Sequence, residues 1–179
     1  MGGRPKGLLP APSGETIVAR ALALCERAKL DVVFVGDATA YTHLAPGVPA
    51  LADEPRGIGP LGGLVALLEH ASHGGARHAI ALACDMPYVT LELLERLIDD
   101  AVDGEAAIVA PRRHDGHAGW EPLCARYDAA RVLPSARARV LRGAHSLQGL
   151  LDDAGARELV LDATERDWLR DWDTPDDAR

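Results

Sequence analysis

The stretch HAIALACDMPYVTLELLERLIDDAV, residues 78–102, contains the two kinds of element that decide the fold. Its first part, residues 78–85, is an almost continuous apolar run that ends in an aspartate, which is typical of a strand covered on both faces. Its last part, residues 90–102, repeats leucine and isoleucine at helical spacing. A buried strand followed by an amphipathic helix indicates an α/β unit.

The same alternation extends along the rest of the chain. We expect helices at 17–28 (with Thr16 as N-cap), 61–71, 129–141 and 146–155, strands at 31–36, 105–111, 121–127 and 157–162, and a polar loop at 112–120. No linker or internal repeat divides the sequence. The pattern therefore predicts an α/β fold with a mostly parallel sheet, formed as a single domain by residues 1–179.

Composition restricts the class of partner. The chain has a formal net charge of -8, and its longest basic block is Arg112-Arg113, so a general affinity for nucleic acid or an anionic membrane is not expected. Three widely spaced cysteines do not suggest a disulfide framework, and the longest apolar runs are far too short to span a bilayer. We expect a cytoplasmic protein that acts on a small molecule.

Asp85 is the best candidate for a metal ligand. In open α/β sheets, ligands bind beside the carboxyl ends of the strands. Asp85 ends the strand expected at 78–85, and Pro87 stops that strand, so the carboxylate can point into a cleft. Mg²⁺ keeps several waters and needs only one or two protein carboxylates. The alternative is an aspartate that only caps a turn.

Two glycine-rich stretches suggest phosphate binding. Residues 50–64, ALADEPRGIGPLGGL, place an acidic pair and four glycines before a helix, whose N-terminus can face an anion. The opening MGGRPKGLL offers Gly2 and Gly3 for backbone contacts and Lys6 as a positive charge. Neither stretch is a Walker A loop or a GxGxxG turn. An ordinary strand-to-helix loop and a solvated lysine are the alternatives.

Taken in order, these stretches resemble the molybdenum cofactor guanylyltransferases and related nucleotidyltransferases. The matching segments are MGGRPKGLL, VVFVG, ADEPRGIGPLGGLVALL, LACDMPYVTLELLERL, EPLCARY and DWDTPDD, and they cover nearly the whole chain. The resemblance implies a three-layer, Rossmann-like nucleotidyltransferase fold. It also implies transfer of GMP from GTP to molybdopterin with Mg²⁺ as cofactor, and a molybdoenzyme or chaperone that receives the product.

The resemblance also assigns roles to individual residues. It implies that Gly2, Gly3 and Lys6 contact the nucleotide phosphates, that Asp53 helps to hold the nucleotide, and that Asp85 ligates Mg²⁺. The GPLGG loop would lie beside the pterin substrate, through the residues Gly59, Pro60 and Gly62, with Asp173 also at the substrate. Asp171 and Asp173 stand where asparagine is common in the family, and their charge offers a second metal contact or a helix cap.

The sequence departs from the family pattern at its start. Residue 1 already aligns with the MGG of the signature, and the strand and LAGG turn that precede it in the family have no counterpart here. That strand would lie mid-sheet, and each buried N–H or C=O group left unpaired costs about 1–3 kcal/mol. We therefore expect the natural reading frame to begin upstream, with roughly 5 or 6 more strand residues and a loop.

Two substitutions leave alternatives open. Pro5 replaces an aspartate of the signature, and Gly36 replaces an asparagine. The loss of that asparagine weakens the expectation of guanine selectivity. A CTP-dependent molybdopterin cytidylyltransferase and a sugar-phosphate nucleotidyltransferase are the alternative enzymes. The alternative from another class is a non-catalytic, truncated paralogue that acts as a binding module.

Overall fold

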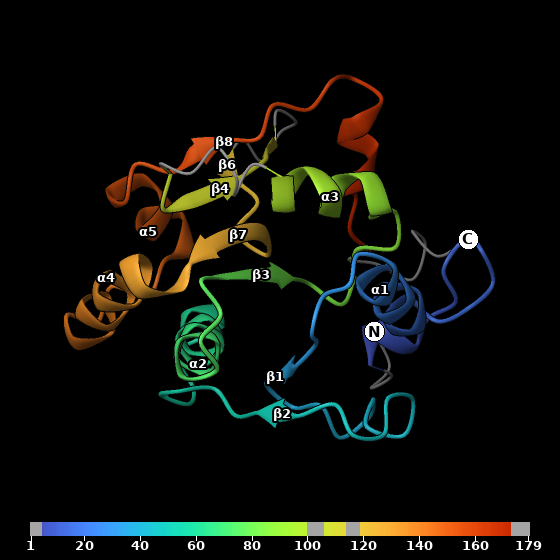
Figure 1. Ribbon diagram of the computed structural model, residues 1–179, viewed down its shortest axis with the longest axis horizontal. Coiled ribbons are helices and arrows are strands. Elements are labelled where there is room, and N and C mark those ends of the chain that lie inside the picture. The colour runs from blue at the N-terminus through green and yellow to red at the C-terminus, as the bar shows by residue number, and fades with distance from the viewer. Residues whose placement is uncertain (1–4, 100–105, 114–118, 173–179) are drawn as a thin grey trace.

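The computed structural model describes residues 5–99, 106–113 and 119–172 of the chain (Figure 1). Its helices are α1 (Ile17–Arg27), α2 (Pro60–His73), α3 (Leu91–Asp99), α4 (Ala129–Leu141) and α5 (Leu147–Asp153), with the 3₁₀ turns η1 (Lys6–Leu8) and η2 (Glu165–Leu169). Within these ranges, none of the helices is both long and apolar enough to cross a membrane.

The strands are short, and among the described residues they form three separate sheets. They are β1 (Phe34–Val35), β2 (Ala50–Leu51), β3 (His78–Leu82), β4 (Ile108–Ala110), β5 (Arg112–Arg113), β6 (Gly119–Trp120), β7 (Cys124–Asp128) and β8 (Arg157–Glu158). The main sheet has the order β3-β7-β4-β8, while β1 pairs with β2 and β5 pairs with β6. In the main sheet β3, β4 and β8 share one direction, and β7 runs antiparallel to both of its neighbours.

Helices cover both faces of the main sheet, which confirms the predicted three-layer α/β fold (Figure 1). On one face α2, α4 and α5 pack against side chains such as Ala81, Ile108 and Tyr127. On the other face α1 and α3 pack against Val109 and Cys124. Because successive residues of a strand point to opposite faces, β4 and β7 are buried on both faces, as their apolar runs predicted, whereas β3 is buried on one face and half-buried on the other.

Local signals placed the helices correctly. Thr16 caps α1 as predicted, since its side-chain oxygen accepts a hydrogen bond from the Ala19 N–H at 3.2 Å. Thr90 caps α3 in the same way, through the Leu93 N–H at 3.2 Å. The α3 helix is described as far as Asp99, and residues 100–102 of its expected range lie outside the described part.

The prediction of a buried strand over residues 31–36 is wrong. Only Phe34 and Val35 form β1, and Val35 is 37% exposed. Along its one described ladder, β1 pairs with β2, and no strand among the described residues pairs with its other edge. The exposed Val35 shows that one face of β1 is open to solvent, which a local run of apolar residues does not reveal.

Strand β3 also has one open edge within the described part of the chain. The Ala83 N–H donates to the Leu123 carbonyl at 2.7 Å, on the β7 side. Because antiparallel ladders alternate, the N–H of Ala81 also faces β7, whereas the N–H groups of Ile80 and Leu82 point to the open edge. Half of the backbone groups of β3 therefore have no ladder partner there.

Two further expectations require correction. The expected loop at 112–120 contains the β5 and β6 ladder, in which Arg112 pairs with Trp120. Tertiary contacts stabilise it, because Gln148 accepts from the Trp120 N–H and donates to its carbonyl, both at 2.8 Å. The strand expected at 157–162 is limited to Arg157–Glu158, and Val160 beyond it is 69% exposed.

Candidate active site

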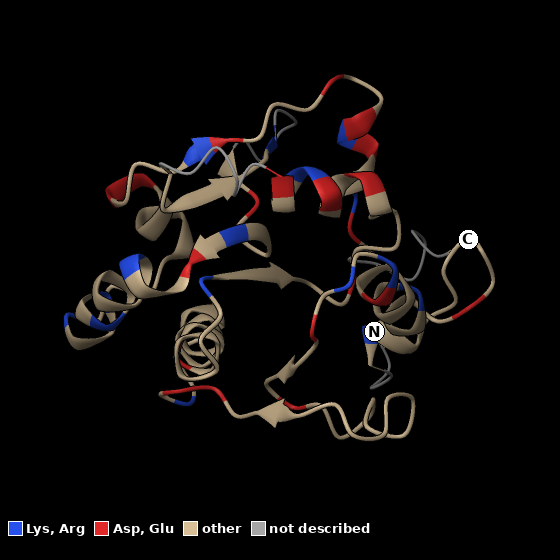
Figure 2. Ribbon diagram, in the orientation of Figure 1, with Lys and Arg blue, Asp and Glu red and all other residues tan. Residues whose placement is uncertain are grey.

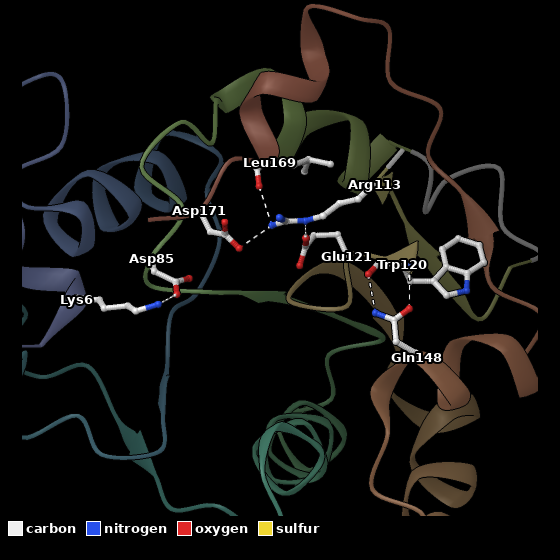
Figure 3. A network of polar contacts seen from close by, with 8 residues as sticks. All are labelled: Lys6, Asp85, Arg113, Trp120, Glu121, Gln148, Leu169 and Asp171. Atoms are coloured by element: carbon white, nitrogen blue, oxygen red, sulfur yellow. Dashed lines mark hydrogen bonds and ion pairs between the residues drawn. The ribbon is translucent and has the colours of Figure 1, made fainter. Parts of the chain in front are cut away.

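Two residues that the sequence singled out are brought together beyond the end of β3. The Lys6 ammonium lies 3.0 Å from Oδ2 of Asp85, although the two residues are 79 positions apart (Figure 3). Their side chains are 33% and 24% exposed, so the pair is open to a ligand while partly shielded from water. A cation and a carboxylate held in this way can serve phosphate and metal binding together.

Lys6 is positioned by a tight turn. Its backbone forms η1, in which Leu8 donates to Pro5 and Leu9 donates to Lys6, both at 3.0 Å. Gly7 is buried against Tyr41, whose Cε1 atom would lie 3.0 Å from any Cβ at this position. A larger residue at position 7 would therefore displace the turn that carries Lys6.

Tyr41 lies between this turn and the strand end. Its hydroxyl is 3.9 Å from the Cys84 sulfur, next to Asp85. Burial raises the pKa of Tyr41 to about 12, so the phenol stays neutral at physiological pH. Tyr41 therefore contributes packing and a hydroxyl group at the site, and no charge.

Backbone contacts from two directions hold the turn that carries Asp85. Arg20 of α1 donates to the carbonyls of Pro87 and Val89, both at 3.0 Å. The N–H of Trp172 donates to the Asp85 carbonyl, also at 3.0 Å. Strand β3 ends at Leu82, so Asp85 stands three residues beyond the strand, and these contacts place it there.

A second carboxylate, that of Asp171, lies beside Asp85 (Figure 3). Arg113 donates to Oδ2 of Asp171 at 2.8 Å and also forms an ion pair with Glu121. Burial is the largest influence on the pKa of Glu121 and raises it, against the opposing effect of Arg113, while Asp171 and Asp85 raise it further. The site therefore places the Asp85 and Asp171 carboxylates next to each other, with Lys6 paired to Asp85 and Arg113 paired to Asp171 and Glu121.

Sequence reasoning did not identify Arg113 and Glu121. Both belong to the region that was expected to be a loop or the start of a strand, and their pairing depends on the β5 and β6 ladder. The one available signal was a basic and an acidic residue eight positions apart on either side of a glycine-bearing turn. Such a pattern is too common on protein surfaces to indicate a site.

Asp53 lies in a different part of the molecule from the pair of Lys6 and Asp85. It is half-buried, beyond the end of β2, with its carboxylate close to Gly36 and Gly63. A cavity of about 340 Å³ opens nearby, at the ends of β1 and β2, with Gly36, Asp37, Thr39 and Ala52 in its lining.

The GPLGG loop begins α2, and its glycines serve two purposes. Gly59 caps the helix with a φ of 77°, and both Gly59 and Pro60 are exposed. Gly62 is buried, and a Cβ there would lie 2.5 Å from the Pro55 carbonyl oxygen. Only glycine allows this close approach. The structure thus gives Gly62 a packing role, whereas Gly59 and Pro60 are free to face a ligand.

Three of the predicted site residues cannot be placed. Gly2, Gly3 and Asp173 lie outside the described residues. Among the described residues, no group of three or more His, Cys, Asp or Glu side chains is arranged to hold a metal ion. The donor set beyond β3 is the pair Asp85 and Asp171, and two carboxylates fit a cation such as Mg²⁺, which retains most of its waters.

Comparison with known proteins assigns the chain to a family. A family model described as the MobA-like NTP transferase domain matches residues 1–160. The chain belongs to the MobA-like NTP transferase family. This MobA-like chain is therefore a nucleotidyltransferase, as the resemblance of its motifs predicted.

Curated relatives agree with this assignment. A probable molybdenum cofactor guanylyltransferase from Mycobacterium marinum is 31% identical over 159 residues, which is 89% of the MobA-like chain and 77% of the relative. One of the same description from Mycobacterium tuberculosis is 33% identical over the same coverage.

Solved structures confirm the fold. Molybdopterin-guanine dinucleotide biosynthesis protein A from Archaeoglobus fulgidus has a TM-score of 0.74 at 22% identity, covering 98% of the MobA-like chain and 88% of that protein. The 2-C-methyl-D-erythritol 4-phosphate cytidylyltransferase from Thermus thermophilus has a TM-score of 0.70 at 16% identity, with coverages of 97% and 89%. At these identities the likeness concerns the fold alone.

Proposed function

We propose that this chain transfers GMP from GTP to molybdopterin and releases pyrophosphate, with Mg²⁺ as cofactor. The observation that carries the proposal is the ion pair of Lys6 and Asp85 beyond the end of β3. Both residues match the motifs of the guanylyltransferases, and relatives named as such are 31% to 33% identical to this chain. We expect the reaction to take place in the cytoplasm.

The proposed chemistry needs no nucleophilic side chain. A terminal phosphate oxygen of molybdopterin attacks the α-phosphorus of GTP and forms a new P–O bond. The bond from that phosphorus to the oxygen bridging to the β-phosphate breaks, and its electron pair leaves with pyrophosphate. The protein contributes by holding the reactants in line and by offsetting negative charge.

Lys6 and Asp85 would divide this work. The Lys6 ammonium would bind phosphate oxygens, because it is a partly exposed cation at the strand end. Asp85, together with Asp171, would hold Mg²⁺ through carboxylate oxygens. The bound cation would supply positive charge that offsets the charge of the triphosphate. Asp85 would then exchange its contact with Lys6 for a contact with the cation.

The nucleoside and the pterin would lie in the region formed by β1, β2 and the start of α2. We place the nucleoside in the cavity at the ends of β1 and β2, next to Asp53. Gly2 and Gly3, which lie outside the described residues, would contact the phosphates through their backbone. The molybdopterin would lie along the exposed start of α2, at Gly59 and Pro60, with Asp173 nearby in sequence to Asp171. A molybdoenzyme or its chaperone would accept the product.

Gly36 supports a second candidate, a CTP-dependent transfer to molybdopterin. It lines the cavity and carries no side chain, so it cannot read the base by a side-chain hydrogen bond. In the guanylyltransferases that this chain resembles, an asparagine occupies the position. Base selection would therefore depend on neighbours such as Asp37 and Thr39.

The test is a pyrophosphate-release assay with molybdopterin, Mg²⁺ and each nucleoside triphosphate in turn. We expect release with GTP, and its dependence on molybdopterin would exclude simple hydrolysis. Lys6→Ala is expected to lower the rate, whereas Lys29→Met, which changes an exposed lysine elsewhere, is the matched control. Release with CTP alone would favour the cytidylyltransferase, and no release with any triphosphate would favour a binding module.

A further inference from the structure

Arg113 is the most densely paired side chain of the site. Its Nε atom forms an ion pair with Glu121, while its Nη2 atom donates to Oδ2 of Asp171 at 2.8 Å and to the Leu169 carbonyl at 3.0 Å (Figure 3). The Arg113 side chain is 20% exposed, and those of Glu121 and Asp171 are 13% and 33% exposed. One guanidinium thus links β5 to two carboxylates and to the backbone of the last residue of η2.

The charges around Asp85 favour a contact that holds Asp171 in place. In the ion pairs among the described residues, the three carboxylates of Asp85, Asp171 and Glu121 are paired with two cationic groups, Lys6 and Arg113. Like charges at short range repel, so an unrestrained Asp171 would turn away from Asp85 toward solvent. The contact with Arg113 opposes that movement. The excess negative charge is what a divalent cation would neutralise.

We propose that Arg113 is a positioning residue that holds Asp171 beside Asp85, so that both carboxylates can face one divalent cation. This inference rests on the proposed nucleotidyl transfer and names a residue that sets the geometry of its cation site. Arg113 itself touches neither the cation nor the nucleotide in this arrangement. It acts through Asp171, whose Oδ2 atom accepts the hydrogen bond from Arg113, so that the carboxylate would present its other oxygen to the cation.

The segment that carries Asp171 is fixed on both sides of that residue. On one side, the Leu169 carbonyl accepts from Arg113 at 3.0 Å. On the other side, the N–H of Trp172 donates to the carbonyl of Asp85 at 3.0 Å, and the Trp172 side chain is buried. Asp171 therefore has little backbone freedom, and its side-chain direction depends on Arg113.

Lysine cannot replace arginine in this role. The guanidinium is planar and presents several N–H donors in fixed directions, which allows one side chain to reach Glu121, Asp171 and Leu169 at once. An ammonium on a flexible stem keeps the charge but loses that fixed fork. Arg113→Lys therefore separates the positioning role from the charge.

The experiment measures Mn²⁺ binding by the full chain without nucleotide, by titration with electron paramagnetic resonance detection. We expect Arg113→Lys to weaken Mn²⁺ binding by about 10- to 100-fold, the usual effect of losing an outer partner of a metal ligand. The matched control is Arg137→Lys, which breaks a similar two-bond contact with Glu69. Arg137 belongs to α4, at the opposite end of the molecule from α1 (Figure 2).

The outcomes separate this inference from the proposed function. Unchanged Mn²⁺ affinity in Arg113→Lys, or an equal loss of affinity in Arg137→Lys, would overturn the role of Arg113. The pyrophosphate-release assay would still test the proposed nucleotidyl transfer. Absence of Mn²⁺ binding in the unaltered chain would overturn the role of Arg113 as well. If Arg113→Lys does not fold, Asp171→Asn provides the test, because it keeps an acceptor oxygen for Arg113 and should weaken Mn²⁺ binding by a similar factor.

Discussion

Replacing Asp85 by asparagine should separate the role of this residue in activity from its role in stability. The side-chain contact through which Asp85 can affect the free energy of unfolding is its ion pair with Lys6. The two atoms are 3.0 Å apart, and the side chains of Lys6 and Asp85 are 33% and 24% exposed. Ion pairs this open to water contribute up to about 1 kcal/mol. Asparagine also keeps an oxygen that can accept from Lys6, and the contact from Trp172 uses the backbone of residue 85.

The stability of Asp85→Asn should therefore change little. A loss of at most about 1 kcal/mol corresponds to a fall in Tm of roughly 2–4 °C for a chain of this size. The effect on turnover should be much larger, because the carboxylate would hold the cation that offsets the charge of the reacting phosphates. Loss of one such electrostatic contact typically lowers kcat by about 10²- to 10³-fold, or roughly 2.7–4 kcal/mol in the transition state.

Both quantities can be measured on one preparation, by thermal denaturation and by pyrophosphate release. Asp99→Asn is the matched control, because Asp99 is an exposed aspartate at the end of α3, and it should change neither quantity. Full turnover by Asp85→Asn would remove this residue from the mechanism. A fall in unfolding free energy of several kcal/mol would instead show that Asp85 has a mainly structural role.

Four further predictions concern stability and exposure. Gly62→Ala should destabilise the protein by about 1–3 kcal/mol in urea denaturation, because the added Cβ would lie 2.5 Å from a backbone carbonyl; an unchanged midpoint would contradict the packing. Burial raises the pKa of Cys124 from 9.0 to about 12, so the stability that its protonated thiol contributes is complete below pH 9 and is lost as the pH rises toward 12. Alkylation of the folded protein at pH 8 should label the exposed Cys84 and spare Cys124 in mass spectrometry, and equal labelling would show that the core opens readily. In hydrogen exchange followed by NMR, the amide of Ile80, on the open edge of β3, should exchange at least about tenfold faster than that of Ala81, and equal protection would mean that the edge is covered.

Some local sequence signals were sufficient to predict the secondary structure, and others were not. Helix starts were predictable because a cap such as Thr16 acts on N–H groups within one turn. The strand over 31–36 was predicted too long and too buried, because its apolar pattern is local, whereas burial depends on which strands flank β1. The direction of β7 was also undetermined, since antiparallel and parallel strands share the same composition when both faces are covered.

The residues of the candidate site were likewise predictable only in part. The sequence identified Lys6 and Asp85 as residue types suited to phosphate and Mg²⁺, but their contact at 3.0 Å joins segments 79 positions apart. Arg113 gave no signal, because its partner Asp171 is 58 positions away and its other partner lies across a ladder that was expected to be a loop. Charged residues acquire such roles only from their neighbours in space.

By itself, the sequence determined the order of the helices and of the strands in the main sheet, the layered α/β class and the chemical types at the strand ends. These follow from periodicity and caps, which act over a few residues. The tertiary structure alone decided which strands pair, that Gly62 packs against a carbonyl, and that Arg113 holds Asp171 beside Asp85. The physical reason is that these contacts join distant segments, so they depend on how whole elements bury their apolar faces against one another.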